Sequence, residues 1–195
     1  MIHRYYTFDK VISSQNCDTF LDRYKELDFE SGAVWSYDDK AQAGSTDGSW
    51  TQEESKRKAK IRWIDVKETM VLAMWACVLE ANQHYKLNIT GFGPAQLTRY
   101  DKDDFYGWHQ DSFYYTQHEK DGERKLSAIL QLTKPEDYEG CEVQLFNGDS
   151  DLEKLPFKDQ GSIIVFRSEE WHRVNPLLKG TRYSLVFWAF GPSLK

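Results

Sequence analysis

Apolar residues in the first half of the chain recur at helical spacing in two segments. The first follows Ser13 and Ser14, which are good N-cap residues, and its apolar positions are Cys17, Phe20, Leu21, Tyr24 and Leu27. A second helix is predicted to start near Asp65, with Glu68 as its capping-box partner. Its apolar face carries Val71, Met74, Trp75, Val78, Leu79 and Tyr85. Each helix therefore has one face to bury against another layer.

The second half of the chain has a pattern typical of strands. Five short segments are rich in β-branched and aromatic residues and are bounded by turn residues: 96–100, 126–133, 141–146, 162–167 and 182–190. The segments between them are too short for βαβ crossovers, which favours an antiparallel sandwich or jelly roll. We therefore expect a mostly β fold, with N-terminal helices packed on a C-terminal jelly roll.

Two further stretches of the first half lack a clear apolar pattern. Residues 31–49 are rich in Gly, Ser and Asp and predict a long loop, a kind of segment that is often functional. The basic cluster at 56–60 follows two glutamates, and we expect it to form a solvated face. We expect one domain over 1–195, with helical support and a lid region in 1–93 and the catalytic jelly-roll core in 94–195.

Composition narrows the class of protein. With 40% hydrophobic and 29% charged residues the chain reads as globular, and it has no run of 18 apolar residues that could span a membrane. The first residues do not resemble a signal peptide, and the three cysteines do not resemble a disulfide framework, so a cytoplasmic protein is expected. The net charge of −6 argues against a general nucleic-acid binder.

Three residues have the chemistry of a metal site. His109 and Asp111 are two positions apart, so on a strand they would point to the same face, and His172 follows a later predicted strand. Two histidines and one carboxylate leave coordination positions open, as in non-haem Fe(II) oxygenases. Structural zinc is disfavoured because it needs four ligands, usually including thiolates, and no cysteine is near either histidine in the sequence.

A candidate anion-binding arginine follows the three candidate metal ligands in the sequence. Arg182 lies in the inward alternation of an otherwise apolar strand, and Ser184 shares its face. A buried arginine needs an anionic partner, and a guanidinium with a neighbouring hydroxyl is a good receptor for a carboxylate.

Residues 97–191 resemble the catalytic domain of prolyl 4-hydroxylases and of the related PKHD-type hydroxylases. The resemblance is carried by ordered motifs: Leu-Thr-Arg-Tyr ending at Tyr100, Tyr-Gly-x-His-x-Asp from Tyr106 to Asp111, Leu126-Ser127, Trp171-His-Arg-Val-Asn-Pro176, Gly180-x-Arg-Tyr-Ser184 and Trp188. The fold it implies is the double-stranded β-helix, which is a cupin-like jelly roll.

The resemblance also implies cofactors and roles. His109, Asp111 and His172 match the catalytic Fe(II) ligands, with 2-oxoglutarate and O₂ as co-substrates, and ascorbate remains open as a reductant. Arg182 matches the residue that pairs with the far carboxylate of 2-oxoglutarate. Ser184, Tyr100 and Gln131 are the other expected co-substrate residues, although Gln131 stands where some members have a tyrosine.

The implied reaction is hydroxylation of a prolyl residue in a peptide or protein. Trp188, Arg124 and Tyr106 are the expected substrate-binding residues, and the loops 31–49 and 112–123 are the expected covering segments. Three alternatives stay open: a hydroxylase of a free amino acid or other small molecule, a nucleic-acid demethylase, which the acidic charge disfavours, and a catalytically dead jelly-roll binding module, which the complete metal set argues against.

Overall fold

Two larger antiparallel sheets, two short strand pairs and two helices make up the described part of the fold. The computed structural model describes residues 3–37, 48–112, 122–146, 153–155 and 157–192. Its larger sheet has the strand order β1 (Tyr5–Phe8), β14 (Ile163–Arg167), β10 (Glu123–Gln131), β17 (Arg182–Gly191), β8 (Ala95–Tyr100), β6 (Lys60–Ile64) and β2 (Glu30–Ser31), with β7 (Gly91–Phe92) also paired to β17. The smaller sheet has the order β13 (Glu153–Lys154), β12 (Val143–Leu145), β15 (His172–Val174), β9 (Phe105–His109) and β5 (Arg57–Lys58).

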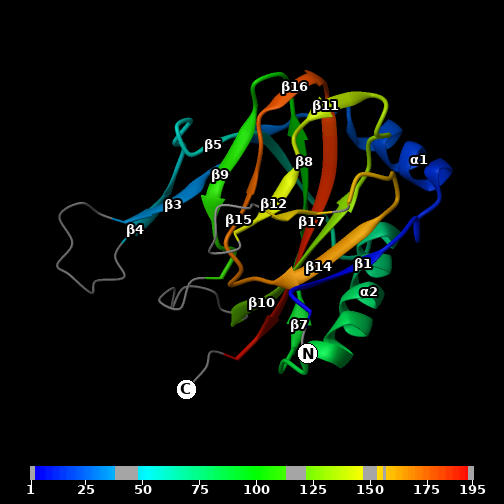
Figure 1. The fold of residues 1–195 in the computed structure, drawn as a ribbon, viewed down its shortest axis with the longest axis vertical. Coiled ribbons are helices and arrows are strands. Elements are labelled where there is room, and N and C mark those ends of the chain that lie inside the picture. Colours follow the sequence, from blue (N-terminus) through cyan, green and yellow to red (C-terminus); the bar gives the residue numbers. More distant parts are fainter. Residues whose placement is uncertain (1–2, 38–47, 113–121, 147–152, 156, 193–195) are drawn as a thin grey trace.

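Two short pairs complete the strands. One joins β11 (Tyr138–Gly140) to β16 (Leu177–Gly180), and the other joins β3 (Val34–Tyr37) to β4 (Gly48–Thr51). The β3–β4 pair extends away from the body of the molecule, on the side opposite the helices (Figure 1). The loop predicted over residues 31–49 is therefore wrong for the strand residues within it, and positions 38–47 lie outside the described residues.

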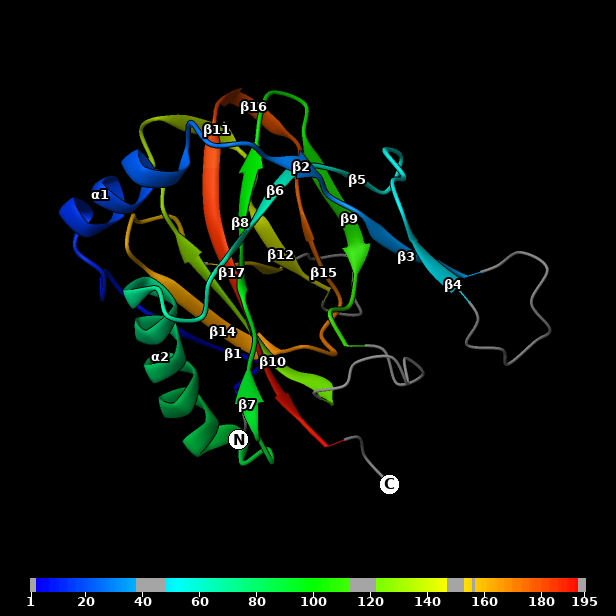
Figure 2. The same cartoon turned by 180° about the vertical axis from the view of Figure 1, so that it is seen from behind.

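Both helices cover one face of the larger sheet, and the smaller sheet lies on the other side (Figures 1 and 2). Helix α1 (Ser14–Tyr24) begins as predicted, because the Ser13 hydroxyl accepts a hydrogen bond of 3.2 Å from the Asn16 amide. Helix α2 (Thr69–Tyr85) ends at Lys86, whose backbone is left-handed at φ 55°. The mostly β prediction is confirmed, although strands precede α1 and separate it from α2.

The start of α2 differs from the prediction. It begins at Thr69 rather than near Asp65, and Glu68 makes no side-chain cap bond. The Asp65 carboxylate instead accepts from the Lys67 amide at 2.7 Å, which closes a turn before the helix. Leu79, expected on the apolar face, is 45% exposed. No capping box forms, because α2 begins after Glu68, whose carboxylate binds Arg23 and Tyr24 of α1.

Alternation along β10 and β17 separates two cores. Leu126, Ala128 and Leu130 on β10 pack toward the helices, as do Leu185 and the next alternate positions of β17, Phe187 and Ala189. Ile129 joins a second core between the sheets, with Phe166 of β14 and Val174 of β15. The intervening inward positions of β17 are Arg182, Ser184, Val186 and Trp188. Two polar residues, Arg182 and Ser184, therefore lie inside the sandwich on the same row of β17 as Val186 and Trp188.

One cysteine differs from its predicted position. Cys141 does not open a strand: it has φ 58° and follows Gly140 at φ 85°, so the chain turns here before β12 begins at Val143. Cys17 and Cys141 are buried, Cys77 is half-buried, and all three are free thiols. Within the described part of the chain, neither helix is long and apolar enough to cross a membrane.

Glu68→Gln should weaken the α1–α2 contact at neutral pH. The Glu68 carboxylate accepts from Arg23 Nη2 at 2.7 Å and from the Tyr24 hydroxyl at 3.0 Å. Burial raises the pKa of Glu68, but these two hydrogen bonds outweigh it and hold the pKa below 4.5. The stabilisation is therefore present above the unfolded pKa and is lost as pH falls through the lowered folded pKa.

We expect the free energy of unfolding of Glu68→Gln to fall by about 1 kcal/mol at pH 7, measured by urea denaturation. The difference from wild type should shrink on acidification below the pKa of Glu68. Glu80→Gln, on the exposed part of α2, is the matched control and should change little. An equal loss in both variants would contradict this account of Glu68.

Candidate metal centre and its cavity

The three predicted ligands converge on one point. His109 is the last residue of β9, and His172 is the first residue of the neighbouring strand β15, where the two histidines are paired in register. Asp111 Oδ1 lies 3.8 Å from His109 Nε2, and Asp111 Oδ2 lies 3.6 Å from His172 Nε2. Among the described residues this is the one group of three acidic, histidine or cysteine side chains whose ligand atoms all lie within 4.8 Å of one another.

Backbone carbonyls orient both imidazoles. His109 Nδ1 is 2.8 Å from the Gly107 carbonyl, and His172 Nδ1 is 2.9 Å from the Glu170 carbonyl. Because a carbonyl oxygen can only accept, each Nδ1 carries the proton and donates it. In the neutral form of each ring, Nε2 then presents a lone pair toward Asp111, which is the tautomer that a metal ion requires.

The third ligand is held by a bend rather than by a strand. Asp111 lies beyond the end of β9, where its amide donates to the Ser168 carbonyl at 2.9 Å. Its Oδ2 accepts from the Ser127 hydroxyl at 2.7 Å, and Ser127 and Ser168 share a hydrogen bond of 2.9 Å. The bend turns the carboxylate toward the histidine pair, so convergence does not depend on strand alternation as predicted.

The protonation states suit a metal ion. Burial, followed by repulsion from His172, lowers the pKa of His109 well below 6.5, so its imidazole is neutral at pH 7. Burial raises the pKa of Asp111, but His172 and His109 outweigh it and the pKa falls to about 2. Neutral imidazole and ionised carboxylate are the forms that bind divalent metals. The ligand spacings slightly exceed the roughly 3 Å expected for adjacent ligands with bonds of about 2.1 Å, which a small inward movement would correct.

A cavity of about 390 Å³ opens from the three ligands and lies between the two sheets. This volume is in the range of small-molecule sites. Each of the three expected substrate residues, Trp188, Arg124 and Tyr106, lines it. The Tyr106 ring stacks on His109 at 3.5 Å between centroids. The Arg124 Cζ lies 4.2 Å from the Trp188 ring centroid, and the Trp188 indole nitrogen has no hydrogen-bond partner in the described structure.

The expected co-substrate residues form a second, deeper group. Arg182 is only 2% exposed, and its Nε donates to Gln131 Oε1 at 3.0 Å. Its Cζ lies 5.8 Å from the Tyr100 ring centroid, and its Nη1 is 3.9 Å from Cys141 Sγ. Tyr100 lines the cavity, whereas Arg182, Gln131 and Ser184 do not. Tyr100 thus separates the buried arginine from the cavity.

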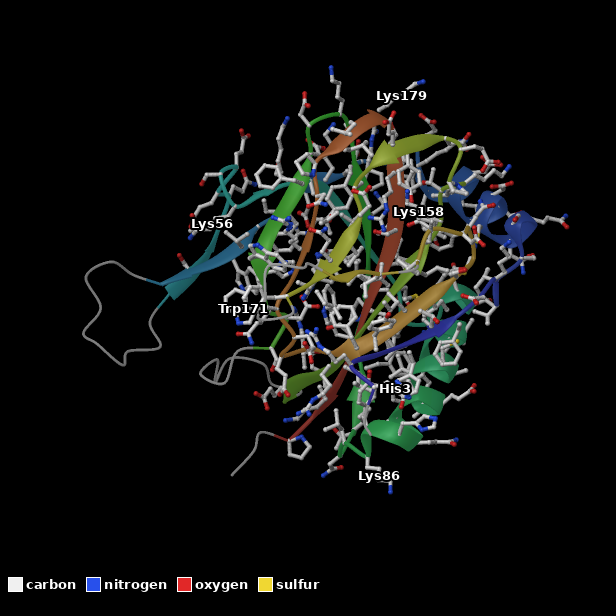
Figure 3. All side chains as sticks on the ribbon, viewed as in Figure 1. His3, Lys56, Lys86, Lys158, Trp171 and Lys179 are labelled. Carbon is white, nitrogen blue, oxygen red and sulfur yellow. The ribbon has the colours of Figure 1, made fainter. Side chains whose placement is uncertain are left out.

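Arg57 is the main functional candidate that sequence reasoning missed. The basic cluster at 56–60 was expected to be solvated, but Arg57 is 7% exposed and lines the cavity. The prediction is correct for Lys56, which lies at the periphery of the molecule (Figure 3). The only sequence signal for the burial of Arg57 was strand alternation, which places Arg57 on the opposite face from the neighbouring lysines of the cluster. Gln96 and Trp63 also line the cavity and were not predicted.

The predicted covering loops are described only in part. Ser31, Ala33, Trp50 and Gln52 line the cavity, so the segment that includes β3 and β4 does border it. Residues 113–121 of the other loop, predicted over 112–123, lie outside the described residues.

Comparison with known proteins agrees with this geometry. The profile of the 2OG-Fe(II) oxygenase superfamily matches residues 95–190, the segment that contains the three ligands and Arg182. Over this segment, which is just under half of its length, the chain is similar to the 2OG-Fe(II) oxygenase superfamily.

Individual relatives support the same family. A PKHD-type hydroxylase of Synechococcus sp. strain CC9902 is 37% identical over 94 residues, which span 47% of this chain and 39% of that protein. A Pseudomonas putida prolyl-4-hydroxylase structure superposes with a TM-score of 0.68 at 21% identity, covering 97% of this chain and 93% of the other. A Trichoplax adhaerens prolyl hydroxylase, solved with a peptide of hypoxia inducible factor, gives 0.66 at 20% identity over 96% and 83%. The two structures show a shared fold.

The metal centre predicts stabilisation by divalent ions. A metal that binds only the folded protein should raise its stability by about 2.7 kcal/mol at a hundredfold excess over the dissociation constant. Thermal melts with and without Mn(II) should therefore show an upward shift in wild type and none in His172→Ala. His84→Ala is the control, because His84 stacks on Tyr6 outside the cavity. An undiminished shift in His172→Ala would place the metal elsewhere.

Proposed function

We propose that this protein is an Fe(II)- and 2-oxoglutarate-dependent dioxygenase that hydroxylates a prolyl residue of a peptide or protein. The observation that carries the oxygenase part is the convergence of two imidazoles and one carboxylate at the end of a cavity. The proposal includes a single domain over 1–195, with 94–195 folded as the double-stranded β-helix and 1–93 as its support. It also includes a cytoplasmic location, supported by the three free thiols.

His109, Asp111 and His172 would hold the iron. A bound Fe(II) with 2-oxoglutarate supplies the oxidant that inserts one atom of O₂ into a C–H bond, a chemistry that belongs to the cofactor. These three ligands would leave coordination positions open for the co-substrate and O₂. Gly107 and Glu170 keep the imidazoles aimed, and Ser127 keeps the carboxylate aimed. Ascorbate as a reductant is part of this proposal.

Arg182 is the proposed partner of the far carboxylate of 2-oxoglutarate. The charged Arg182 side chain is only 2% exposed. Its partners among the described side chains include Gln131 and Cys141 but no carboxylate. A buried cation without an anion is costly, and a carboxylate ligand would remove that cost. Burial raises the pKa of the Tyr100 hydroxyl, so it stays protonated and can donate to the same ligand. Ser184 adds a hydroxyl on the same face of β17.

The prolyl part of the proposal rests on the cavity wall. Trp188 offers an apolar ring for a pyrrolidine and an indole N–H without a partner in the described structure. Arg124 stacks on Trp188, and Tyr106 stacks on His109, so aromatic surfaces flank the metal ligands. The similarity to the Trichoplax prolyl hydroxylase, which was solved with a peptide fragment, supports a chain-like substrate. The alternative is a small molecule such as a free amino acid, and a methylated nucleic acid is disfavoured by the net charge of −6.

Arg182→Gln should raise the KM for 2-oxoglutarate by about 10- to 100-fold, because a charge-assisted bidentate hydrogen bond is lost. The assay is succinate formation at varied 2-oxoglutarate. Arg99→Gln, on the adjacent strand and paired with Asp101, is the control and should retain the wild-type KM. Asp111→Ala should abolish succinate formation entirely. An unchanged KM in Arg182→Gln would mean that another cation holds the co-substrate.

Proline-containing peptides should gain one oxygen when incubated with the enzyme, Fe(II), 2-oxoglutarate and ascorbate. Tandem mass spectrometry should locate the added oxygen on the proline ring, and omission of 2-oxoglutarate should prevent it. Turnover of a free amino acid or a methylated base, with peptides left unmodified, would overturn the prolyl substrate while leaving the oxygenase chemistry intact.

A further inference from the structure

Arg57 is a buried cation in the wall of the metal cavity. Its guanidinium lies between Gly32 and the Tyr106 ring: its Cζ is 4.5 Å from the ring centroid, and a Cβ on Gly32 would come within 2.6 Å of Nε. Its Nη1 donates to the Ala33 carbonyl at 3.1 Å, and its Nη2 donates to Gln96 Oε1 at 2.7 Å. The Nε is buried and has no hydrogen-bond partner among the residues that the structure describes. The side chain is thus held rigidly, but its hydrogen-bonding capacity is only partly used.

No carboxylate neutralises this charge within the described residues. The acidic side chains that line the cavity are Asp111 and Glu30, and neither forms an ion pair with Arg57. Asp111 is committed to Ser127 and the histidine pair. The Ala33 carbonyl, the Gln96 side-chain oxygen and the face of the Tyr106 ring offset part of the free-energy cost of burying the guanidinium. An anion is the best partner for an arginine that lines a cavity.

This position differs from the one proposed for the co-substrate. Arg182 lies behind Tyr100, at the start of β17, and does not line the cavity. Arg57 reaches in from β5, at the edge of the smaller sheet, and bonds Gln96 in the middle of β8. The Tyr106 ring separates Arg57 from His109, so a group bound at Arg57 is one aromatic ring away from a metal ligand. The 2-oxoglutarate has one far carboxylate, which leaves the second cation to another ligand.

We infer that Arg57, supported by Gln96, forms a carboxylate-binding subsite for the primary substrate. The substrate therefore carries a carboxylate close to the carbon that is hydroxylated. That carboxylate belongs to a free amino acid, to the C-terminus of a peptide, or to an acidic side chain beside the reacting residue. Trp63, 6.2 Å from Trp188 between ring centroids, supplies apolar surface for the rest of the ligand. This inference rests on the proposed oxygenase function.

The test compares probes that differ only in one carboxylate. The pairs are L-proline with L-prolinamide, Gly-Pro with its amide, and N-acetyl-Asp-Pro-amide with N-acetyl-Asn-Pro-amide. Binding is measured by isothermal titration to Zn(II)-loaded protein saturated with 2-oxoglutarate, so that no turnover occurs. In wild type the carboxylate member of at least one pair should bind about 10- to 100-fold more tightly, as a charged hydrogen bond predicts. The pair that discriminates identifies the source of the carboxylate.

Variants separate anion binding from a structural role of Arg57. Arg57→Gln should abolish the carboxylate preference, Arg57→Lys should keep part of it, and Arg62→Gln, on β6 outside the cavity, should keep all of it. Gln96→Glu keeps Arg57 but gives it an internal carboxylate, and it should also abolish the preference. This variant decides the matter if Arg57→Gln does not fold, as judged by its melting temperature.

The outcomes that overturn the inference are distinct from failure of the proposed function. Equal affinity within every pair, or no binding by any carboxylate probe, overturns the subsite while 2-oxoglutarate still binds. A carboxylate preference that persists in both Gln96→Glu and Arg57→Gln would also overturn the subsite. Loss of 2-oxoglutarate binding in Arg57→Gln would assign Arg57 to the co-substrate and also overturn it. Failure of wild type to bind 2-oxoglutarate would instead reject the oxygenase proposal.

Discussion

The antiparallel pairing of β9 with β15 is the constraint on which the site depends. In this register His109 lies opposite His172, so two residues far apart in the sequence become cross-strand neighbours with ring centroids 4.0 Å apart. The same ladder ends here, and the bend that follows lets the Asp111 amide bond the Ser168 carbonyl. A slip of one residue would turn one imidazole out of the cavity, because strand side chains alternate between faces.

Burial between the sheets sets the protonation states of the site residues and also makes each unpaired polar group there costly in free energy. Apolar residues of β10, β14 and β15 close the space between the sheets, which keeps water from Arg182 and Ser184 of β17. In that setting the His109 imidazole stays neutral, the Asp111 carboxylate stays ionised, and each remaining polar group needs a partner. The Ser127 hydroxyl donates a hydrogen bond to Asp111, and the Gln131 side-chain oxygen accepts one of the hydrogen bonds of Arg182. The cations Arg182 and Arg57 keep unused hydrogen-bonding capacity, which is the physical sign that the cavity is built for anionic ligands.

The helices support the site from outside the sandwich. The helix-facing residues of β10 and β17, such as Leu130 and Phe187, pack against Met74 and its neighbours on α2. The alternate residues of the same two strands point to the cavity, so helix packing and site geometry are coupled through the pleat. The rigid larger sheet thereby holds Trp188 and Ile129 in the wall facing the metal ligands.

The sequence by itself determined the strand periodicity, the first helix cap at Ser13, the identity of the three candidate ligands and the burial of Arg182, because alternation, capping chemistry and ordered motifs can be recognised without knowing which strands pair. It could not decide features that depend on partners distant in the chain. Glu68 matched a capping box, but Arg23 and Tyr24 on the other helix took its carboxylate. Residues 34–37 and 48–51 were predicted to lie in a loop or at its edge, but they pair with each other as strands. Arg57 read as one cation of a solvated cluster, yet β5 pairs with β9 and turns it into the cavity. Only the tertiary structure decides which side of a short polar strand meets water, since that depends on which strand it pairs with and what covers its face.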